Sequence, residues 1–186
     1  TKRGFLTQEE IRLLINGTFK KKSYELIRDL FIFCTFTGLS WTDMANLTKA
    51  NLRTSFDGHL WLDTNRQKTG VETNIRLLDV ARHIIEKYDG MAERDKLLPV
   101  PCYANCKNGI KAIAKKCGIE KPVSFHLSRH SFAVMALNYG MPIESVSKIL
   151  GHTDIKTTQI YAKVTNTKLN SDISAFENKI SGRFDI

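Results

Sequence analysis

The sequence is poor in several residue types, and each shortage excludes a class of protein. Four cysteines among 186 residues are too few for a secreted disulfide scaffold, so we expect a reducing, cytoplasmic setting. No unbroken apolar run approaches the roughly 20 residues of a membrane-spanning helix, and no apolar segment follows the first charged residues as in a signal peptide. Acidic residues are outnumbered 19 to 28 by basic ones, which leaves a net charge of +9 and favours a polyanionic partner.

Helical periodicity and helix-capping signals cover most of the chain. Thr7 and Glu10 have the spacing of a capping box, and residues 24–37 are apolar on almost every side, as in a helix at the centre of a domain. Gly38 is a typical helix end, and Ser40 is a typical N-cap for the short helix that we expect after it. Further helices are expected at residues 79–88, 103–117, 125–138, 142–150, 155–164 and 171–180.

A strand-like pattern occupies the middle of the chain. Three short runs are joined by two turns, one at Asp57 and Gly58 and the other near Lys68, which predicts an antiparallel meander. We therefore expect a single α+β domain, mainly α, in which a helical bundle carries a small three-stranded antiparallel sheet. The expected strands are residues 52–55, 59–64 and 72–77.

Two histidines and an arginine are concentrated at the start of one predicted helix. His126, Arg129 and His130 are three and four residues apart, so they share a helix face. A solvated basic face is the ordinary interpretation of such a pattern. A zinc site is the poorer one, because the glutamate that follows the first histidine in zincins is missing. We expect His130 to support the site from behind rather than to contact a substrate.

A second polar cluster follows about twenty residues later. Gly151 ends one predicted helix and places His152 on the connection to the next, and Tyr161 comes nine residues after His152. Taken alone, this tyrosine is more typical of a half-buried core aromatic than of a nucleophile. The two clusters together favour a chemical role.

With these motifs the sequence resembles the tyrosine recombinases, the phage-integrase family. The resemblance rests on H-x-x-R at His126 and Arg129, on L-G-H at residues 150–152, and on Tyr161. Thr-Gly-Leu at residues 37–39 is similar to the first motif of the family, and the turn at Lys68 to its hairpin lysine. The resemblance implies a catalytic domain at residues 6–186, including a C-terminal tail helix, with residues 1–5 as the linker from a missing N-terminal DNA-binding domain.

The resemblance also implies a reaction and a role for each matching residue. Tyr161 would attack a phosphodiester and form a covalent 3′-phosphotyrosine, without a metal, another cofactor or ATP. Arg129 would hold two non-bridging oxygens, and His152 would donate a hydrogen bond to one. His126 would help to deprotonate the tyrosine, and Lys68 would protonate the leaving 5′-oxygen.

One position departs from the family pattern. The arginine that normally follows Thr-Gly-Leu is replaced by Ser40, as in some members that resemble integrases of Bacteroidetes mobile elements. Arg66 is our candidate substitute, because it lies two residues before Lys68 and an extended strand would turn both to the same side. A solvated strand-end arginine or a simple contact with the DNA backbone is an equal alternative for Arg66.

Further basic residues are candidates for contacts with duplex DNA. Lys107, Lys111 and Lys115 follow one face of a predicted helix, and Arg53 lies in the first predicted strand. Each could instead be part of an ordinary solvated surface. The resemblance implies a homotetramer on DNA and a monomer in isolation. The tail would pack either on its own domain or on a neighbouring copy.

Three other functions remain open at this stage. Loss of the first arginine could have left a non-catalytic DNA-binding module derived from an integrase. A type IB topoisomerase would share the tyrosine chemistry, although the short catalytic unit favours an integrase. A metallohydrolase using His126, His130, Cys102 and Cys106 would predict bound zinc.

Overall fold

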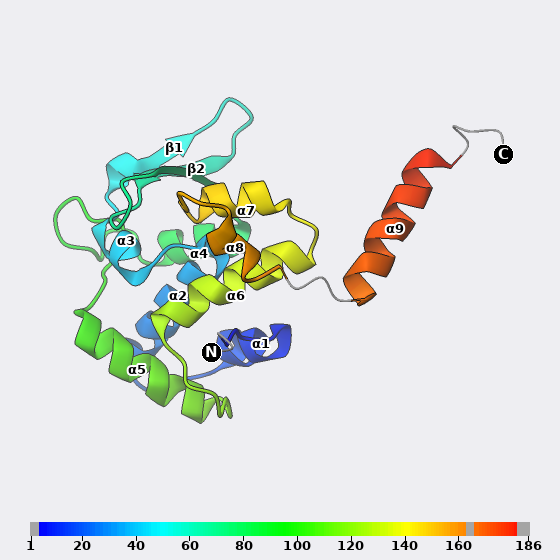
Figure 1. Cartoon of the computed structure of the whole chain (residues 1–186). Coiled ribbons are helices and arrows are strands. Elements are labelled where there is room, and N and C mark those ends of the chain that lie inside the picture. The colour runs from blue at the N-terminus through cyan, green and yellow to red at the C-terminus, as the bar shows by residue number, and fades with distance from the viewer. Residues whose placement is uncertain (1–3, 163–165, 182–186) are drawn as a thin grey trace.

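The computed structural model describes residues 4–162 and 166–181, which form helices around one small sheet. Figure 1 shows the sheet at one end of the helical body, with α7 beside it and α9 standing apart. The predicted fold class is confirmed. The elements in chain order are α1 (Gln8–Asn16), α2 (Lys22–Thr37), α3 (Trp41–Asn46), a 3₁₀ turn (Lys49–Asn51), β1 (Leu52–Thr54), β2 (Leu60–Asn65), β3 (Glu72–Arg76), α4 (Asp79–Lys87), α5 (Tyr103–Lys116), α6 (Phe125–Asn138), α7 (Ile143–Ile149), α8 (Lys156–Gln159) and α9 (Asn166–Ile180).

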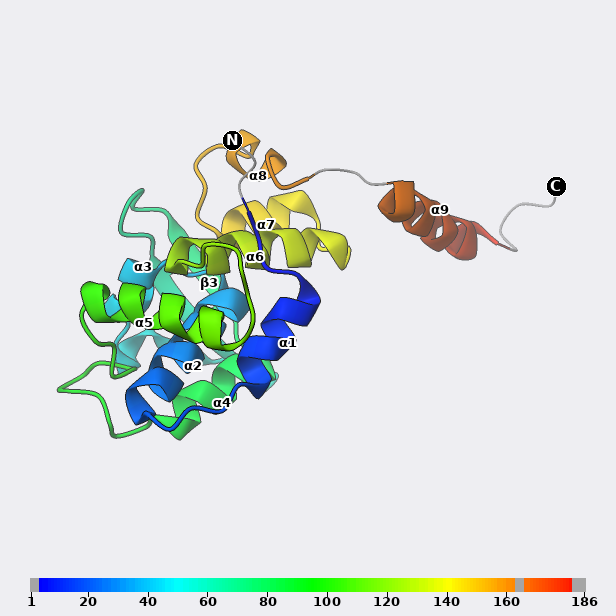
Figure 2. The ribbon, with the colours of Figure 1, turned by 90° about the horizontal axis from the view of Figure 1, so that it is seen from below.

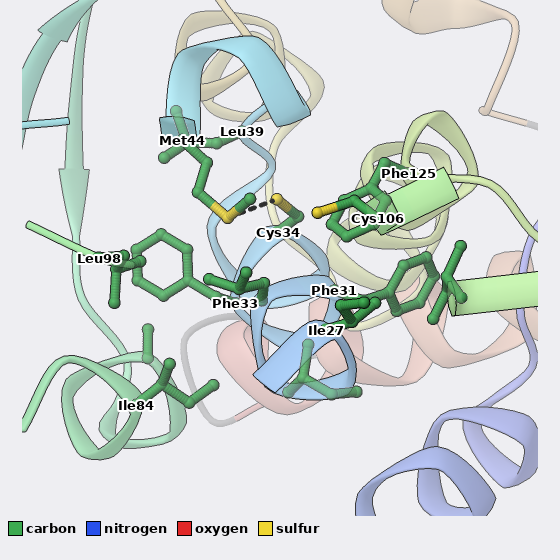
Figure 3. Packing of buried hydrophobic residues seen from close by; sticks show 14 of the residues in the cluster. Ile27, Phe31, Phe33, Cys34, Leu39, Met44, Ile84, Leu98, Cys106 and Phe125 are labelled. Atoms are coloured by element: carbon green, nitrogen blue, oxygen red, sulfur yellow. Dashed lines mark hydrogen bonds between the residues drawn. The ribbon is translucent and has the colours of Figure 1, made fainter. Parts of the chain in front are cut away.

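Helix α2 is the centre of the domain, as its apolar sequence predicts. It packs against α1, α4, α5 and α6, and Phe31 and Phe33 are completely buried. Figure 3 shows Phe31 beside Phe125 of α6, with ring centroids 5.5 Å apart. The same view shows the Cys34 thiol directed at the sulfur of Met44 on α3. These contacts fix α3 and α6, which carry site residues, on one central helix.

The sheet has the order β1-β2-β3, and both pairs are antiparallel. Leu62 and Ile75 face each other across β2 and β3 and are buried against the helices. Side chains alternate along a strand, so Arg53 and Trp61 lie on the opposite, outer face, where they are paired in register. The inner face of the sheet therefore belongs to the core, and its β2–β3 end reaches the candidate site.

Gly38 allows α2 and α6 to approach each other closely. It ends α2 in the left-handed conformation, with φ at 72°, and a Cβ atom there would lie 2.8 Å from the Phe132 ring. Phe132 belongs to a second apolar cluster that includes Val146 and Leu150 of the α7 region, with Tyr161 packed against it. This cluster brings the segment of His126 and Arg129 on α6 together with the segment that carries His152 and Tyr161.

Most of the predicted elements are confirmed, and two helices differ in extent from the prediction. The capping box of Thr7 and Glu10 is present, and α6 has the predicted bounds. The helix expected at residues 155–164 is a single turn, Lys156–Gln159, and residues 163 and 164 lie outside the described part. Its β-branched residues have low helix propensity. Residues 1–3 of the expected linker also lie outside the described residues.

Helix α9 is exposed along most of its length and lies away from the other helices in both views (Figures 1 and 2). It begins five residues before the predicted start. Within the described residues, none of the helices has the combination of length and apolar composition that crossing a bilayer requires.

Candidate active site

Arg129 is held inside the protein by two backbone carbonyl groups. The residue is only 4% exposed, and its Nη1 donates to the Gly38 carbonyl at 2.6 Å while its Nη2 donates to the Leu150 carbonyl. Gly38 ends α2 and Leu150 follows α7, so the packing of these helices on α6 sets the position of the guanidinium group. The result is a preorganised cation with a fork of donors that suits phosphate oxygens.

Arg66 reaches the same carbonyl from the sheet. Its Nη1 donates to the Leu150 oxygen at 2.8 Å, so the two guanidinium groups share one acceptor with each other. The Nε of Arg66 is buried and has no hydrogen-bond partner within the described part of the chain. Two guanidinium groups that donate to one oxygen are close together, so their positive charges repel each other. A bound anion would relieve this repulsion.

Arg66 does not lie in a strand, so the argument by which we predicted its orientation is wrong. Strand β2 ends at Asn65, and Arg66 is the first residue of a turn, where its carbonyl accepts from the N–H groups of Thr69 and Gly70. The strand alternation that was expected to align Arg66 with Lys68 therefore does not apply. Arg66 comes to the site because its side chain extends to the end of α7.

Ser40 caps α3, as predicted, and also takes part in anchoring the lysine turn. Its Oγ accepts from the Asp43 N–H at 3.1 Å and donates to Asp43 Oδ2 at 2.7 Å. Asp43 is 5% exposed, and its Oδ1 accepts the N–H of Gln67 at 2.9 Å. Gln67 directly precedes Lys68, so one buried carboxylate connects α3 to the turn.

Lys68 lies on the exposed turn between β2 and β3. On its other side, Thr69 Oγ1 donates to the carbonyl of Gly151 at 3.2 Å. Gly151 precedes His152 on the connection between α7 and α8. The turn is thus fixed both to α3 and to the segment that carries His152.

The two histidines of α6 form a chain that ends at Tyr161. His126 Nε2 and His130 Nε2 are 2.7 Å apart, and the ring of His130 lies 5.1 Å from that of Tyr161 in an edge-on arrangement. His126 is exposed, His130 is 4% exposed and Tyr161 is half-buried. His130 therefore packs behind His126 and directly against Tyr161.

His152 is held in an environment that favours its neutral form. Burial lowers its pKa to about 4, and the positive charge of Arg66 and the proximity of His130 act in the same direction. Its Nδ1 is 2.8 Å from Thr158 Oγ1. When the threonine hydroxyl donates to Nδ1, the proton of the neutral ring is on Nε2, which can then donate to a ligand.

The segments that carry the predicted catalytic residues thus lie in one region, although they come from five parts of the chain. The guanidinium groups meet at Leu150, two residues before His152, and His152 is close enough to His130 and Arg66 to be affected electrostatically by both. Tyr161 adjoins His130. Two guanidinium groups near a neutral imidazole and a phenol are the groups needed to bind a phosphate ester and attack it.

The predicted DNA contacts differ in their availability. Lys107, Lys111 and Lys115 are exposed along α5. Arg53 makes a two-donor contact with Asp63 at 2.5 and 3.2 Å, which lowers the pKa of that carboxyl group. An arginine already engaged by a carboxylate is a weaker candidate for binding phosphate than the three lysines.

The ligands of the metallohydrolase alternative are not gathered into a site. Among residues 4–162 and 166–181, no three histidine, cysteine, aspartate or glutamate side chains are placed to hold one ion. His126 and His130 are hydrogen-bonded to each other, and Cys102 and Cys106 lie at the start of α5. Within the described part of the chain, the four residues of that alternative therefore do not lie together as ligands of one ion.

Asp43 and Thr158 are functional candidates that our sequence reasoning missed. Asp43 follows Ser40 by three residues, the spacing of a capping residue and its partner, and this signal could have identified the carboxylate. Its contact with Gln67 is long-range and left no local pattern. Thr158 lies in a segment whose helix was predicted too long.

Comparison with known proteins identifies the family of the chain. Residues 4–168 match the model of the phage integrase family. Tyrosine recombinase XerD of Listeria monocytogenes serotype 4b is 35% identical over 156 residues, covering 75% of this chain and 50% of the relative. Tyrosine recombinase XerA of Saccharolobus solfataricus is 35% identical over 169 residues, covering 90% and 54%. This chain spans about half the length of these curated relatives.

Solved structures share the fold at low sequence identity. A crystal structure of XerA recombinase aligns with a TM-score of 0.73 at 20% identity, over 99% of this chain and 67% of that one. The catalytic domain of bacteriophage HP1 integrase aligns at 0.65 and 23% identity, over 98% and 99%. The family match covers most of the chain, and the chain therefore belongs to the phage integrase family of tyrosine recombinases.

Proposed function

We propose that this chain is the catalytic part of a site-specific DNA recombinase that cleaves and rejoins strands through Tyr161. The observation that carries the proposal is that Arg129 and Arg66 donate to the same carbonyl, that of Leu150. His152 follows two residues later, and His130, next to Arg129 in the chain, packs against the ring of Tyr161. A non-catalytic module that only binds DNA would have no need for a phenol next to a phosphate-binding fork.

The proposed reaction transfers a phosphoryl group without a net change in the number of phosphoester bonds. The Tyr161 oxygen attacks phosphorus, the bond to the 5′-oxygen breaks, and a 3′-phosphotyrosine and a free 5′-hydroxyl result. His126 takes part in removing the phenol proton, and Lys68 supplies a proton to the departing oxygen. Arg129 and the Nε2–H of His152 hold the non-bridging oxygens. Rejoining reverses these steps, so no ATP is needed.

We propose that Arg66 partly replaces the arginine missing at Ser40. Support comes from the acceptor that it shares with Arg129 and from its free, buried Nε donor. The side chain of Ser40 is occupied by Asp43, so it is not itself a candidate for holding phosphate. A second guanidinium group from the lysine turn would supply the charge that the family's first motif normally gives.

Duplex DNA is the proposed partner, and phosphate contacts dominate its binding. The stripe of Lys107, Lys111 and Lys115 on α5 and the net charge of +9 support this partner. Arg53 would contribute less, because Asp63 already neutralises it. Binding by such contacts weakens steeply as salt is raised.

We further propose that residues 6–186 work as the catalytic domain of a longer recombinase, which residues 1–5 join to a DNA-binding domain. This division is supported by the curated relatives, of which the chain covers only about half the length. A mobile element like those of Bacteroidetes is the proposed source, because Ser40 replaces the first arginine. The reaction is placed in the cytoplasm, where the four free cysteines would stay reduced.

On DNA we propose a homotetramer, with the isolated domain a monomer. Leu169, Ile173 and Phe176 of α9 are 49–62% exposed and share an apolar stripe. An apolar cavity of about 770 Å³ bordered by α1, α2 and α6 is a suitable receptor for this stripe on a second copy. Light scattering with and without DNA, on wild-type and Phe176→Ala protein, tests this assembly.

A covalent-trapping assay tests the proposed reaction. Nicked duplexes of randomised sequence, in which cleavage releases a short strand and prevents rejoining, are incubated with the protein and analysed in SDS. We expect an SDS-resistant adduct for wild-type protein and none for Tyr161→Phe. Salt-sensitive binding without any adduct would support the non-catalytic module instead.

A further inference from the structure

We propose that an aromatic cavity beside the candidate active site binds one unstacked nucleobase of the DNA strand that is cleaved. The cavity measures about 410 Å³ and adjoins the start of α6. The inference rests on the proposed recombination function and adds a ligand site to it. The residues that line the cavity are Ser40, Trp41, Thr42, Tyr103, Phe125 and His126.

The position of the cavity connects it to the phosphate site. His126 borders it and, through His130, belongs to the chain that ends at Tyr161. Ser40 also borders it and comes two residues after Gly38, whose carbonyl holds Arg129. In Figure 1, α3 lies between the sheet and the first turns of α5 and α6. A nucleotide next to a phosphate on Arg129 is therefore within reach of this cavity.

The walls are suited to stacking. Trp41 and Tyr103 lie with their ring centroids 5.0 Å apart at 64°, and Tyr103 is 49% exposed. The indole N–H of Trp41 is buried away from solvent, so this residue offers aromatic surface rather than a hydrogen-bond donor. Every base has a π-face, which makes such a platform tolerant of sequence.

The charge around the cavity also favours nucleic acid. None of its six lining residues is a carboxylate, and Asp43 nearby is engaged by Ser40 and Gln67. Tyr103 begins α5, and Lys107 follows it by four residues on the same helix face. Phosphate contacts along α5 would lead a strand toward the aromatic rings.

Bases inside an intact duplex are stacked and cannot enter. Extruding a base costs a few kcal/mol, whereas a base near a broken strand has lost part of its stacking. The cavity would thus retain a base next to the cleavage point during the period in which Tyr161 holds the strand. A duplex with one unpaired base mimics this state without any cleavage.

The test measures binding of fluorescein-labelled duplexes by anisotropy at fixed salt, with Tyr161→Phe protein so that no bond is broken. Three probes share one sequence: fully paired, with one unpaired thymine, and with one abasic site in place of that thymine. We expect the thymine bulge to bind about 5- to 140-fold more tightly than the abasic bulge, the range for one base stacked on an aromatic side chain. Both bulges bend the duplex, so their comparison isolates the base.

Variants then assign the preference to the cavity. Tyr103→Ala should abolish it and Tyr103→Phe should keep it, while Phe56→Ala, which removes a fully exposed aromatic from the β1–β2 turn, should leave it unchanged. Trp61→Phe leaves Trp41 as the single tryptophan of the chain, and its fluorescence should be quenched by the thymine bulge alone.

Equal affinities for the two bulges, or a preference that survives Tyr103→Ala, would overturn the proposal. Because the assay needs no nucleophile, its outcome is independent of covalent trapping. If wild-type protein forms no adduct in the trapping assay while the thymine preference still depends on Tyr103, the recombinase reaction is refuted and the base site is retained.

Discussion

Replacing Arg66 tests whether a second guanidinium group completes the phosphate site. Arg66 Nη1 lies 2.8 Å from the Leu150 carbonyl that also binds Arg129. Loss of one preorganised donor to a transition-state oxygen typically lowers a rate by about 10²- to 10³-fold. We therefore expect Arg66→Ala to slow cleavage of a nicked suicide substrate by about that factor under single-turnover conditions.

Stability should change much less than the rate. The Leu150 carbonyl keeps Arg129 as a donor after the substitution, so no buried acceptor is left without a partner. Removing one of two like charges also relieves repulsion. We expect the free energy of unfolding in urea to change by less than about 1 kcal/mol, the range of a partly exposed hydrogen bond.

Two control variants separate geometry from charge. Arg66→Lys keeps the charge without the fork of donors and should recover only part of the rate. Arg76→Ala removes an exposed arginine of β3 and should leave the rate near that of the wild type. Cleavage by Arg66→Ala at the wild-type rate would refute the reasoning.

Three further predictions follow from other contacts. Asp43→Asn weakens the hydrogen bond that anchors the turn of Lys68. It should slow cleavage about tenfold, an order-of-magnitude estimate for one lost charged hydrogen bond. A substrate with a 5′-thiolate leaving group needs no proton from Lys68 and should restore the rate. Gly38→Ala places a Cβ atom at a φ of 72° and 2.8 Å from the Phe132 ring, and should lower the unfolding free energy by about 2–4 kcal/mol. Gly140→Ala is the control: its φ is also positive but its surroundings are open, and it should cost only about 1–2 kcal/mol. Folding lowers the pKa of His152 from an ordinary 6.5 to about 4, so the unfolded chain binds more protons between these pH values. The contribution of His152 to stability is therefore complete above pH 6.5 and is lost as the pH falls toward 4. His152→Gln should flatten this part of the pH profile of the unfolding free energy, measured by urea titration.

The sequence is sufficient to predict the fold wherever local signals agree with packing. The capping box at Thr7, the apolar α2 and the bounds of α6 all follow from periodicity and caps, which tertiary contacts then reinforce. Residues 155–164 were predicted as one helix because their spacing suits it. Thr158 is instead completely buried against His152, and a single turn is enough to place it.

The site was predictable as a set of residues but not as a geometry. Motif order alone identified Arg129 and Tyr161, and the structure brings both into one region. Neither the Leu150 carbonyl shared by two arginines nor the link from Asp43 to Gln67 could be predicted. These contacts join residues 21 or more positions apart through a backbone atom, which leaves no mark on the sequence.

Mapping the trapped adduct tests the central claim most directly. After cleavage of a nicked duplex and digestion with nuclease and trypsin, mass spectrometry would examine the peptide of residues 157–163. We predict a nucleotide 3′-phosphate attached to Tyr161 in that peptide. Attachment to any other residue, or the absence of a covalent nucleotide from protein that binds the same DNA, would contradict the account.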